Sequence, residues 1–238
     1  MRADKKNVSI IFGVLFAAFL FAGILLGPSM RTEAATKYKI VREDRSKTYK
    51  KKGKCKAAVH FDRIVLKGNT AAIKKINKQI KEESIRFLEG AQESGIYENA
   101  KYVAKCGAEN EVFYYTATSE VMYDKKNVIS IVISTDWYAG GVGNTESYGL
   151  TFSLKSGKLL KLTNVCKGNE SSIKKRIIKK AKKYSAKIEP LDISVIRKYK
   201  VDEFRFYLNK KGKVVICFEP YEVASGGWGR ELVINSKY

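Results

Sequence analysis

The chain has 238 residues, 45% of them hydrophobic, which suffices for one sizeable domain or two small ones that share a core. Forty-six lysines and arginines stand against 24 aspartates and glutamates, a net charge of +22 at neutral pH. This charge is extreme for a soluble enzyme; it favours anionic partners and repels basic ones.

The first 35 residues have the pattern of an export signal. Basic residues precede an uncharged apolar run over residues 8–26, and small residues follow, with cleavage expected after Ala34 or Ala35. As a helix, the run would span about 28 Å, roughly a bilayer core, so an uncleaved signal anchor is the alternative. Both interpretations predict an extracytoplasmic protein, either secreted or anchored at the cell surface. The first 34 residues contribute only +2, so the remainder carries +20.

The next segment, residues 36–54, is polar and dense in charge without apolar periodicity, so we predict a flexible basic tether. One domain is then expected over residues 55–238. It opens with a strand over residues 55–66, and a helix follows that begins at Asn69-Thr70. The apolar side chains of this helix fall near one face, with lysines opposite: Ile73, Ile76, Ile80, Phe87 and Ala91.

The remainder of the chain predicts hairpins and a second helix. Strands are expected over residues 102–106, 111–123, 128–138, 145–154, 158–162, 203–208, 213–219 and 231–235. The second helix is expected over residues 170–188, with an apolar stripe beside a dense lysine face. The pattern indicates an α+β fold, in which an antiparallel β-sheet built from hairpins is covered by two main helices.

A glycine-rich stretch at residues 138–145, YAGGVGNT, is similar to a phosphate-binding loop. Such a loop needs lysine charge and the N-terminus of a following helix. The two lysine positions hold Ala139 and Asn144, and the residues that follow alternate like a strand. No nucleotide is therefore expected.

Two longer stretches carry a resemblance to a known family. The sequence YAGGVGNT…FSLKSGKLLKLTNV resembles the signature Tyr-x-Gly-Gly-Ala-His-Gly … Asp-Leu-x-Thr-Gly-Lys-x-Leu-x-Leu-x-Asp-Leu of the RsiV-type extracellular domain family. The sequence VVICFEPYEVASGGWG resembles the later signature of that family, and INKQIKEESIRFLE is similar to its opening helix. The match covers residues 55–236, and the family's histidine falls on Gly143.

This resemblance implies an extracytoplasmic α+β module. The family includes the domain of the lysozyme-sensing anti-sigma factor RsiV and the non-catalytic part of the peptidoglycan deacetylase PdaC. Only seven residues precede the apolar run and no deacetylase segment follows, so we expect neither of those two outputs.

The four cysteines all follow the apolar run, and an even number in an exported chain favours disulfides. Proximity in the sequence favours the pairs Cys55–Cys106 and Cys166–Cys217. The alternative is that some are buried free thiols, and Cys217, in an apolar strand, fits this best. No spacing of cysteine and histidine indicates a metal site, and no cofactor is expected.

Two loops combine glycines with aromatic and acidic side chains. If the loops meet, they would form an aromatic cleft for a glycan or a protein partner. Alternatively, the glycines make tight connections and the aromatic rings fill the core. The candidate binding residues are Trp137, Tyr138, Gly140, Gly141, Gly143, Glu219, Tyr221, Glu222 and Trp228.

Catalysis is the rival interpretation. The sole histidine, His60, lies within a predicted strand and is not expected to act as a base. A glycan hydrolase needs only two carboxylates, and Asp136 with Glu219 or Glu222 would supply them. Glu219 and Glu222 are also explained as residues at a strand end or in a turn.

These patterns favour a non-catalytic binding or sensing module of the cell envelope over a peptidoglycan or glycan hydrolase. Its expected partners are anionic wall polymers or lipid head groups, with peptidoglycan or lysozyme as further candidates and no nucleic acid. Lysozyme follows from the family resemblance alone, and lysozymes are commonly basic, so the net charge opposes that partner.

Overall fold

The computed structural model describes residues 38–52, 54–89, 95–107, 112–139 and 141–238. The predicted export signal, residues 1–35, lies outside this part of the chain. Within the described residues, no helix is both long enough and apolar enough to cross a membrane.

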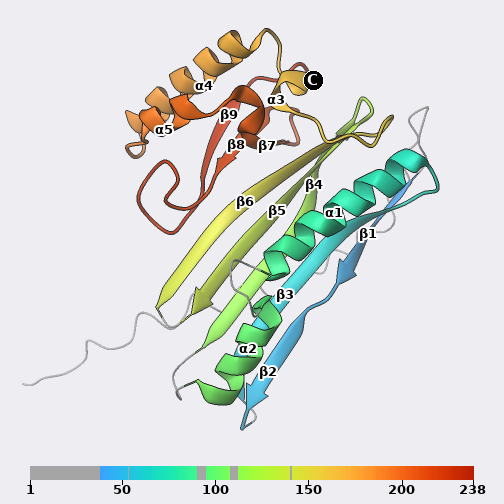
Figure 1. Ribbon diagram of the computed structural model, residues 1–238, viewed down its shortest axis with the longest axis vertical. Coiled ribbons are helices and arrows are strands. Elements are labelled where there is room, and N and C mark those ends of the chain that lie inside the picture. Colours follow the sequence, from blue (N-terminus) through green and yellow to red (C-terminus); the bar gives the residue numbers. More distant parts are fainter. Residues whose placement is uncertain (1–37, 53, 90–94, 108–111, 140) are drawn as a thin grey trace, which may run out of the picture.

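A six-stranded sheet forms the centre of the molecule (Figure 1). Its strands are β1 Lys39–Asp44, β2 Lys47–Lys51, β3 Lys54–Lys67, β4 Phe113–Lys125, β5 Val128–Ala139 and β6 Val142–Ser153. The order is β1-β3-β4-β5-β6, and β2 also pairs with β3, beside β1. The β3–β4 pair is parallel, whereas the other pairs are antiparallel.

Two helices, α1 Ala71–Glu89 and α2 Gly95–Cys106, cover one face of this sheet (Figure 1). Helix α1 begins after Thr70, whose hydroxyl oxygen accepts the Ile73 N–H at 3.2 Å. Ile73, Ile76 and Ile80 are fully buried against apolar side chains of β3, β5 and β6. The first predicted helix is therefore confirmed, and so is its apolar face at these three residues, whereas Ala91 and the side chain of Phe87 lie outside the described residues.

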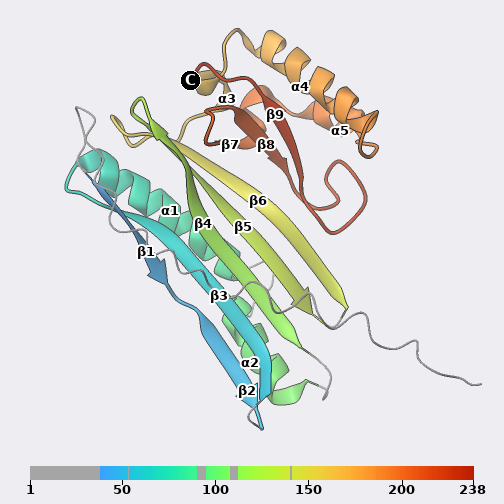
Figure 2. The same cartoon turned by 180° about the vertical axis from the view of Figure 1, so that it is seen from behind.

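A three-stranded antiparallel sheet packs on the opposite face of the large sheet, over the end near the β4–β5 turn (Figure 2). It consists of β7 Arg205–Leu208, β8 Val214–Phe218 and β9 Arg230–Ile234. Helices α4 Glu170–Ser185 and α5 Ile193–Lys198 cover its outer face, and α3 Leu162–Val165 and a 3-10 turn at Val201–Glu203 complete this part. The layers therefore run helix, sheet, sheet, helix.

The two sheets meet with almost no space between β6 and β7. A Cβ atom at Gly149 would lie 2.1 Å from the carbonyl oxygen of Phe206, so only glycine fits there. Beside this contact, the buried Ser130 hydroxyl accepts the Leu208 N–H at 2.8 Å and lies 2.7 Å from the Thr151 hydroxyl. The small sheet is thus held by backbone contact as well as by apolar packing.

The structure confirms the α+β class, the two main helices and the β4–β5 hairpin, and it corrects three elements. Residues 39–51, predicted as part of a flexible tether, form β1 and β2, whose partner is β3. Residues 102–106 belong to helix α2, with Ala100 and Ala104 buried one turn apart. Residues 158–162 form no strand, since only Leu159 bridges to Phe152.

The predicted disulfides are absent from the described side chains, where Cys106, Cys166 and Cys217 are free thiols. Cys166 is buried between the small sheet and α4, whereas Cys217 packs against Val132 on the other side of that sheet. A pair on opposite sides of a sheet cannot be bridged without moving the backbone. Cys106 is exposed at the end of α2, and the side chain of Cys55 lies outside the described residues.

Candidate functional site

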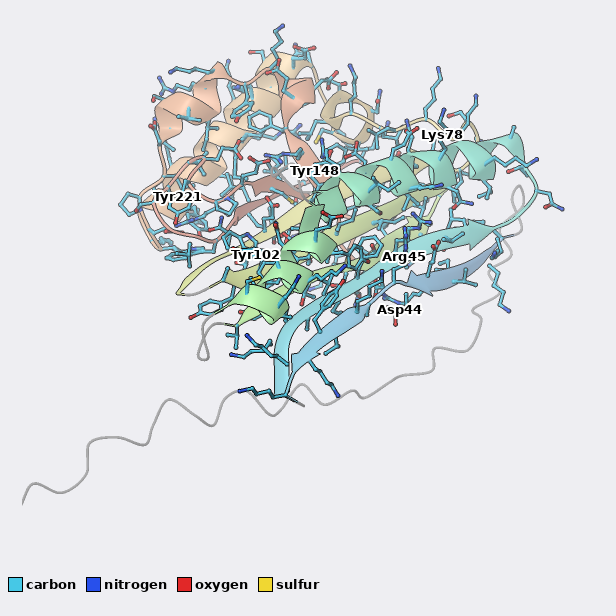
Figure 3. The ribbon with its side chains drawn as sticks, turned by 60° about the horizontal axis from the view of Figure 1, so that its bottom comes forward. Asp44, Arg45, Lys78, Tyr102, Tyr148 and Tyr221 are labelled. Atoms are coloured by element: carbon cyan, nitrogen blue, oxygen red, sulfur yellow. The ribbon has the colours of Figure 1, made fainter. Side chains whose placement is uncertain are left out.

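A cleft of about 1100 Å³ lies on the helix-covered face of the large sheet. Side chains of β4, β5 and β6 form its floor, and α2 and the end of α1 form one wall. Arg205 of β7 and Glu219, directly after β8, stand at the other side. Tyr102 of α2 and Tyr148 of β6 are among its lining residues (Figure 3).

The floor is aromatic because successive strands turn the same face toward the helices. Phe113 and Tyr115 of β4 are buried, and Trp137 of β5 packs partly buried against the same core cluster. Tyr102, on the wall above them, is 68% exposed. Flat apolar faces beside a few polar groups are typical of ligand sites.

Two arginines flank the ring of Tyr148. The guanidinium carbon of Arg86 lies 5.0 Å from the ring centroid, and that of Arg205 lies 5.7 Å from it. Arg205 also forms ion pairs with Glu219 and, at 3.3 Å, with Glu222. The cationic groups of the cleft are therefore held in place by aromatic and acidic neighbours.

Glu146 of β6 is the acidic group at the floor of the cleft. Burial, followed by the charge of Glu219, raises the pKa of this carboxyl above its usual 4.5, and Arg205 opposes the shift. Thr135 donates a long hydrogen bond of 3.4 Å to it. Nearby, the amide oxygen of Asn144 is buried and has no hydrogen-bond partner among the described protein atoms.

The two glycine-aromatic loops predicted from the sequence do lie together beside this cleft. Thr145 donates its N–H to the carbonyl of Gly227 at 2.8 Å and accepts the Gly229 N–H at 2.6 Å. A Cβ atom at Gly227 would lie 2.5 Å from the Gly143 carbonyl oxygen, so glycine is needed at this approach. The loops therefore meet through their backbones.

The predicted residues of the first loop divide between two faces. Trp137 lines the cleft, whereas its neighbour Tyr138 stacks on Tyr114 on the opposite face, with ring centroids 5.7 Å apart. Gly141, at φ +100°, makes the turn between β5 and β6. Gly140 lies outside the described residues.

The predicted residues of the second loop also differ in their positions relative to the cleft. Glu219 lines the cleft, whereas Glu222 accepts hydrogen bonds from the Tyr199 hydroxyl, the Glu219 N–H and Arg205. The hydrogen bond to Glu222 raises the pKa of Tyr199 to about 12. Tyr221 is 65% exposed on the outer side of its loop (Figure 3). Glu222 is thus a structural residue of this turn.

Trp228 is 53% exposed but firmly held. The centroid of its ring lies 4.5 Å from the guanidinium carbon of Arg230. The Arg230 side chain is fully buried and pairs with Glu189. It also donates hydrogen bonds to the backbone carbonyls of Ser225, Gly226 and Trp228. Arg230 therefore fixes the loop that carries Trp228.

The carboxylate pair predicted for a hydrolase is not assembled. Asp136 alternates with Trp137 along β5 and lies on the face opposite the cleft, near Tyr114, whereas Glu219 lines the cleft. The Nδ1 atom of His60 forms a hydrogen bond of 2.8 Å with the Ser46 hydroxyl, and His60 does not line the cleft. Within the described part of the chain, no group of three histidine, cysteine or acidic residues is placed to hold a metal ion.

Sequence reasoning missed Arg86, Glu146, Tyr148 and Arg205. One signal was available for Glu146 and Tyr148, which stand in phase with the buried Leu150 and Phe152 along β6. Alternate residues of a strand share a face, so a glutamate in this series points inward. Arg86 and Arg205 come from separate elements, and only the fold brings them together.

Comparison with solved structures identifies the architecture. A DUF3298 family member from Bacteroides fragilis matches with a TM-score of 0.52 and 17% identity, over 83% of this chain and 90% of that chain. The chain has the DUF3298 fold. A DUF3298 protein from Pseudomonas aeruginosa matches with a TM-score of 0.52 and 15% identity, over 82% and 89% of the two chains.

The DUF3298 fold is the one implied by the resemblance to the RsiV-type domain, which is thereby confirmed at the level of architecture. No protein-family model matches the sequence, and no curated protein matches it.

Proposed function

We propose that this chain is a non-catalytic, extracytoplasmic binding module, and that its cleft takes a saccharide segment of a cell-wall glycan. The observation that carries the proposal is the cleft itself, with Trp137, Tyr115 and Tyr148 around a volume of about 1100 Å³. Aromatic faces pack against the C–H surfaces of sugars, and adjacent polar groups bind their hydroxyls.

The polar groups suit a ligand rich in hydroxyls. The buried amide oxygen of Asn144 needs a donor, and buried polar groups rarely stay without one. The Glu146 carboxyl and the two arginines can exchange hydrogen bonds with sugar hydroxyls and amides. The export pattern at the N-terminus supports a location where such glycans occur.

A wall-directed protein such as lysozyme is the alternative partner. The exposed loop side chains of Tyr221 and Trp228 favour it, because protein interfaces are enriched in such aromatic anchors. The net charge of +22 opposes it, since two basic proteins repel one another.

The test compares two neighbouring aromatic residues on opposite faces of β5. Trp137→Ala removes a ring from the cleft, whereas Tyr138→Ala removes one from the other face. With soluble peptidoglycan fragments as ligand, we expect Trp137→Ala to lower the affinity about tenfold, or about 1.4 kcal/mol, by calorimetry. Tyr138→Ala should bind like the wild type, and thermal unfolding of both variants checks that they are folded.

The proposal would be contradicted if the two variants lost affinity equally, or if the wild-type chain bound none of the fragments. Binding of lysozyme that depends on Trp228 and not on Trp137 would instead assign the exposed loop as the site.

A hydrolase is the second candidate because one observation favours it. Glu146, with its raised pKa, lies in the same cleft as Glu219, and a general acid beside a second carboxylate is what glycoside hydrolysis requires. Release of reducing ends from purified peptidoglycan, abolished by Glu146→Gln, would establish it. If the chain is a binding module, we expect no release of reducing ends.

A further inference from the structure

A second hollow, of about 530 Å³, lies at the other end of β5 and β6 from the cleft. Three segments form it: the β4–β5 turn, the connection from β6 to α3, and the residues after β9 (Figure 1). Four lysines line it, and we call it the lysine pocket: Lys126, Lys155, Lys158 and Lys237.

Backbone hydrogen bonds hold its walls in place. The Leu154 N–H donates to the Asn127 carbonyl at 2.9 Å, which ties the β4–β5 turn to the end of β6. Ser153 donates its N–H to the carbonyl of Lys158 at 3.0 Å, and Lys237 donates to Val165 at 2.9 Å. The lysines therefore extend from a defined frame.

The pocket is rich in positively charged side chains. No aspartate or glutamate lines it, and among the described residues none of the four lysines is part of an ion pair. This contrasts with the cleft, where Arg86 and Arg205 both pair with carboxylates.

Two carboxylates on adjoining segments already have partners, and the partner of one of them, Thr163, belongs to the pocket wall. Asp124 accepts the hydroxyl of Tyr38, and Asp202 accepts the hydroxyl of Thr163 at 2.7 Å and pairs with Lys161 at 3.7 Å.

Hydroxyl groups add directional donors. The Ser153 oxygen accepts the Ser156 N–H, and the Ser156 oxygen accepts the Lys158 N–H, both at 3.3 Å. Each hydroxyl hydrogen is thereby left to donate toward a ligand. The walls also include apolar carbon, with Leu159 44% exposed.

We propose that the lysine pocket binds a phosphate group esterified to a polyol or a sugar. Four ammonium groups and two hydroxyls match a phosphate through charge-assisted hydrogen bonds. The volume and the Leu159 side chain leave room for the carbon skeleton of an ester. This site is separate from the cleft, so the failure of either proposal leaves the other standing.

The test uses glycerol 3-phosphate as the probe and the full chain as the protein. Titration followed by NMR or calorimetry should give saturable binding, with glycerol and acetate inactive. Lys155→Gln/Lys158→Gln should weaken binding about tenfold through the loss of two charge-assisted contacts. The matched control, Lys175→Gln/Lys179→Gln on α4, removes the same charge outside the pocket and should change binding less than about twofold.

Three outcomes would overturn the proposal. One is the absence of saturable binding of glycerol 3-phosphate. Another is an equal loss in the two double variants, which would assign the effect to the overall charge of the protein. The third is inorganic phosphate binding as tightly as the ester, which would contradict a role for the carbon skeleton.

Discussion

At the level of single residues, the floor of the cleft depends on which side of a strand each side chain takes. Glu146, Tyr148, Leu150 and Phe152 follow one another on the same side of β6. The alternation that buries the two apolar residues also places a carboxyl group against aromatic rings. The raised pKa of Glu146 is thus a consequence of strand register.

This shift predicts how stability depends on pH. Because the fold raises the pKa of Glu146 above 4.5, the folded state disfavours the ionised carboxylate. Stability is lost as the pH rises from 4.5 through the folded pKa, since ionisation occurs more readily in the unfolded chain. Glu146→Gln should therefore increase the free energy of unfolding relative to the wild type at pH 7.

Urea denaturation of both proteins at pH 4 and pH 7 measures the difference. We expect the gain from Glu146→Gln to be larger at pH 7 than at pH 4. An equal difference at the two pH values would show that burial does not perturb this group.

The candidate residues were predictable in part, and the exceptions have one cause. Trp137 was predicted and lines the cleft, whereas adjacent Tyr138 cannot, because neighbours on a strand face opposite ways. The same rule removes Asp136 from the cleft. Conversely, the two loops meet at Thr145 and Gly227, which are 82 positions apart in the sequence. The pattern of neighbouring residues does not reveal such a contact.

At the level of elements, the contact between β6 and β7 holds the two sheets together. The Phe206 carbonyl lies directly over Gly149, where no side chain fits. This contact also positions Arg205, the neighbour of Phe206, at the rim of the cleft. The small sheet therefore contributes to the cleft through a backbone approach.

Gly149→Ala should destabilise the protein, because the new methyl group must displace β7 from β6. We expect a loss of about 2 kcal/mol, in the range of other overpacked sites. Chemical denaturation measures it, and Gly141→Ala is a useful comparison because its added Cβ meets no atom within 4 Å, although its positive φ carries its own strain. A Gly149→Ala variant as stable as the wild type would show that the sheets can separate without cost.

Hairpins, helix faces and the Thr70 cap could be predicted because each depends on neighbours in the sequence. Strands β1 and β2 could not, since charged edge strands such as KIVRED and KTYKK have the composition of a linker. Residues 102–106 of helix α2 were predicted as a strand, and its first residues were assigned to no element. The parallel β3–β4 pair depends on contacts between distant segments, so an antiparallel hairpin series did not predict it.

At the level of the whole molecule, the outer helix layer carries a dense set of lysines. Helix α4 buries Ile173, Ile177 and Ala181 and directs lysines outward. Four of these lysines are exposed: Lys175, Lys179, Lys182 and Lys183. This face is turned away from the sheets, and we propose that it contributes to an attraction for anionic wall polymers or lipid head groups.

Retention on anionic cell-wall material should depend on salt. We expect release when the ionic strength rises to roughly 0.5 M, because screening then shortens the reach of surface charge. Replacing the four exposed α4 lysines with glutamine should move release to lower salt, whereas arginine at these positions should preserve it. Retention that is insensitive to salt would contradict a role for charge.

The cleft, like the hydrogen bonds between Thr145 and the Gly227–Gly229 segment beside it, joins parts of the chain that are synthesised at different times. The floor and one wall of the cleft are encoded before residue 150, whereas Arg205 and Glu219 on its other side are encoded later. A polypeptide synthesised from its N-terminal end therefore completes the cleft only after residue 219 has emerged. If the cleft binds a ligand as proposed, the connectivity of the chain alone delays that binding until this point.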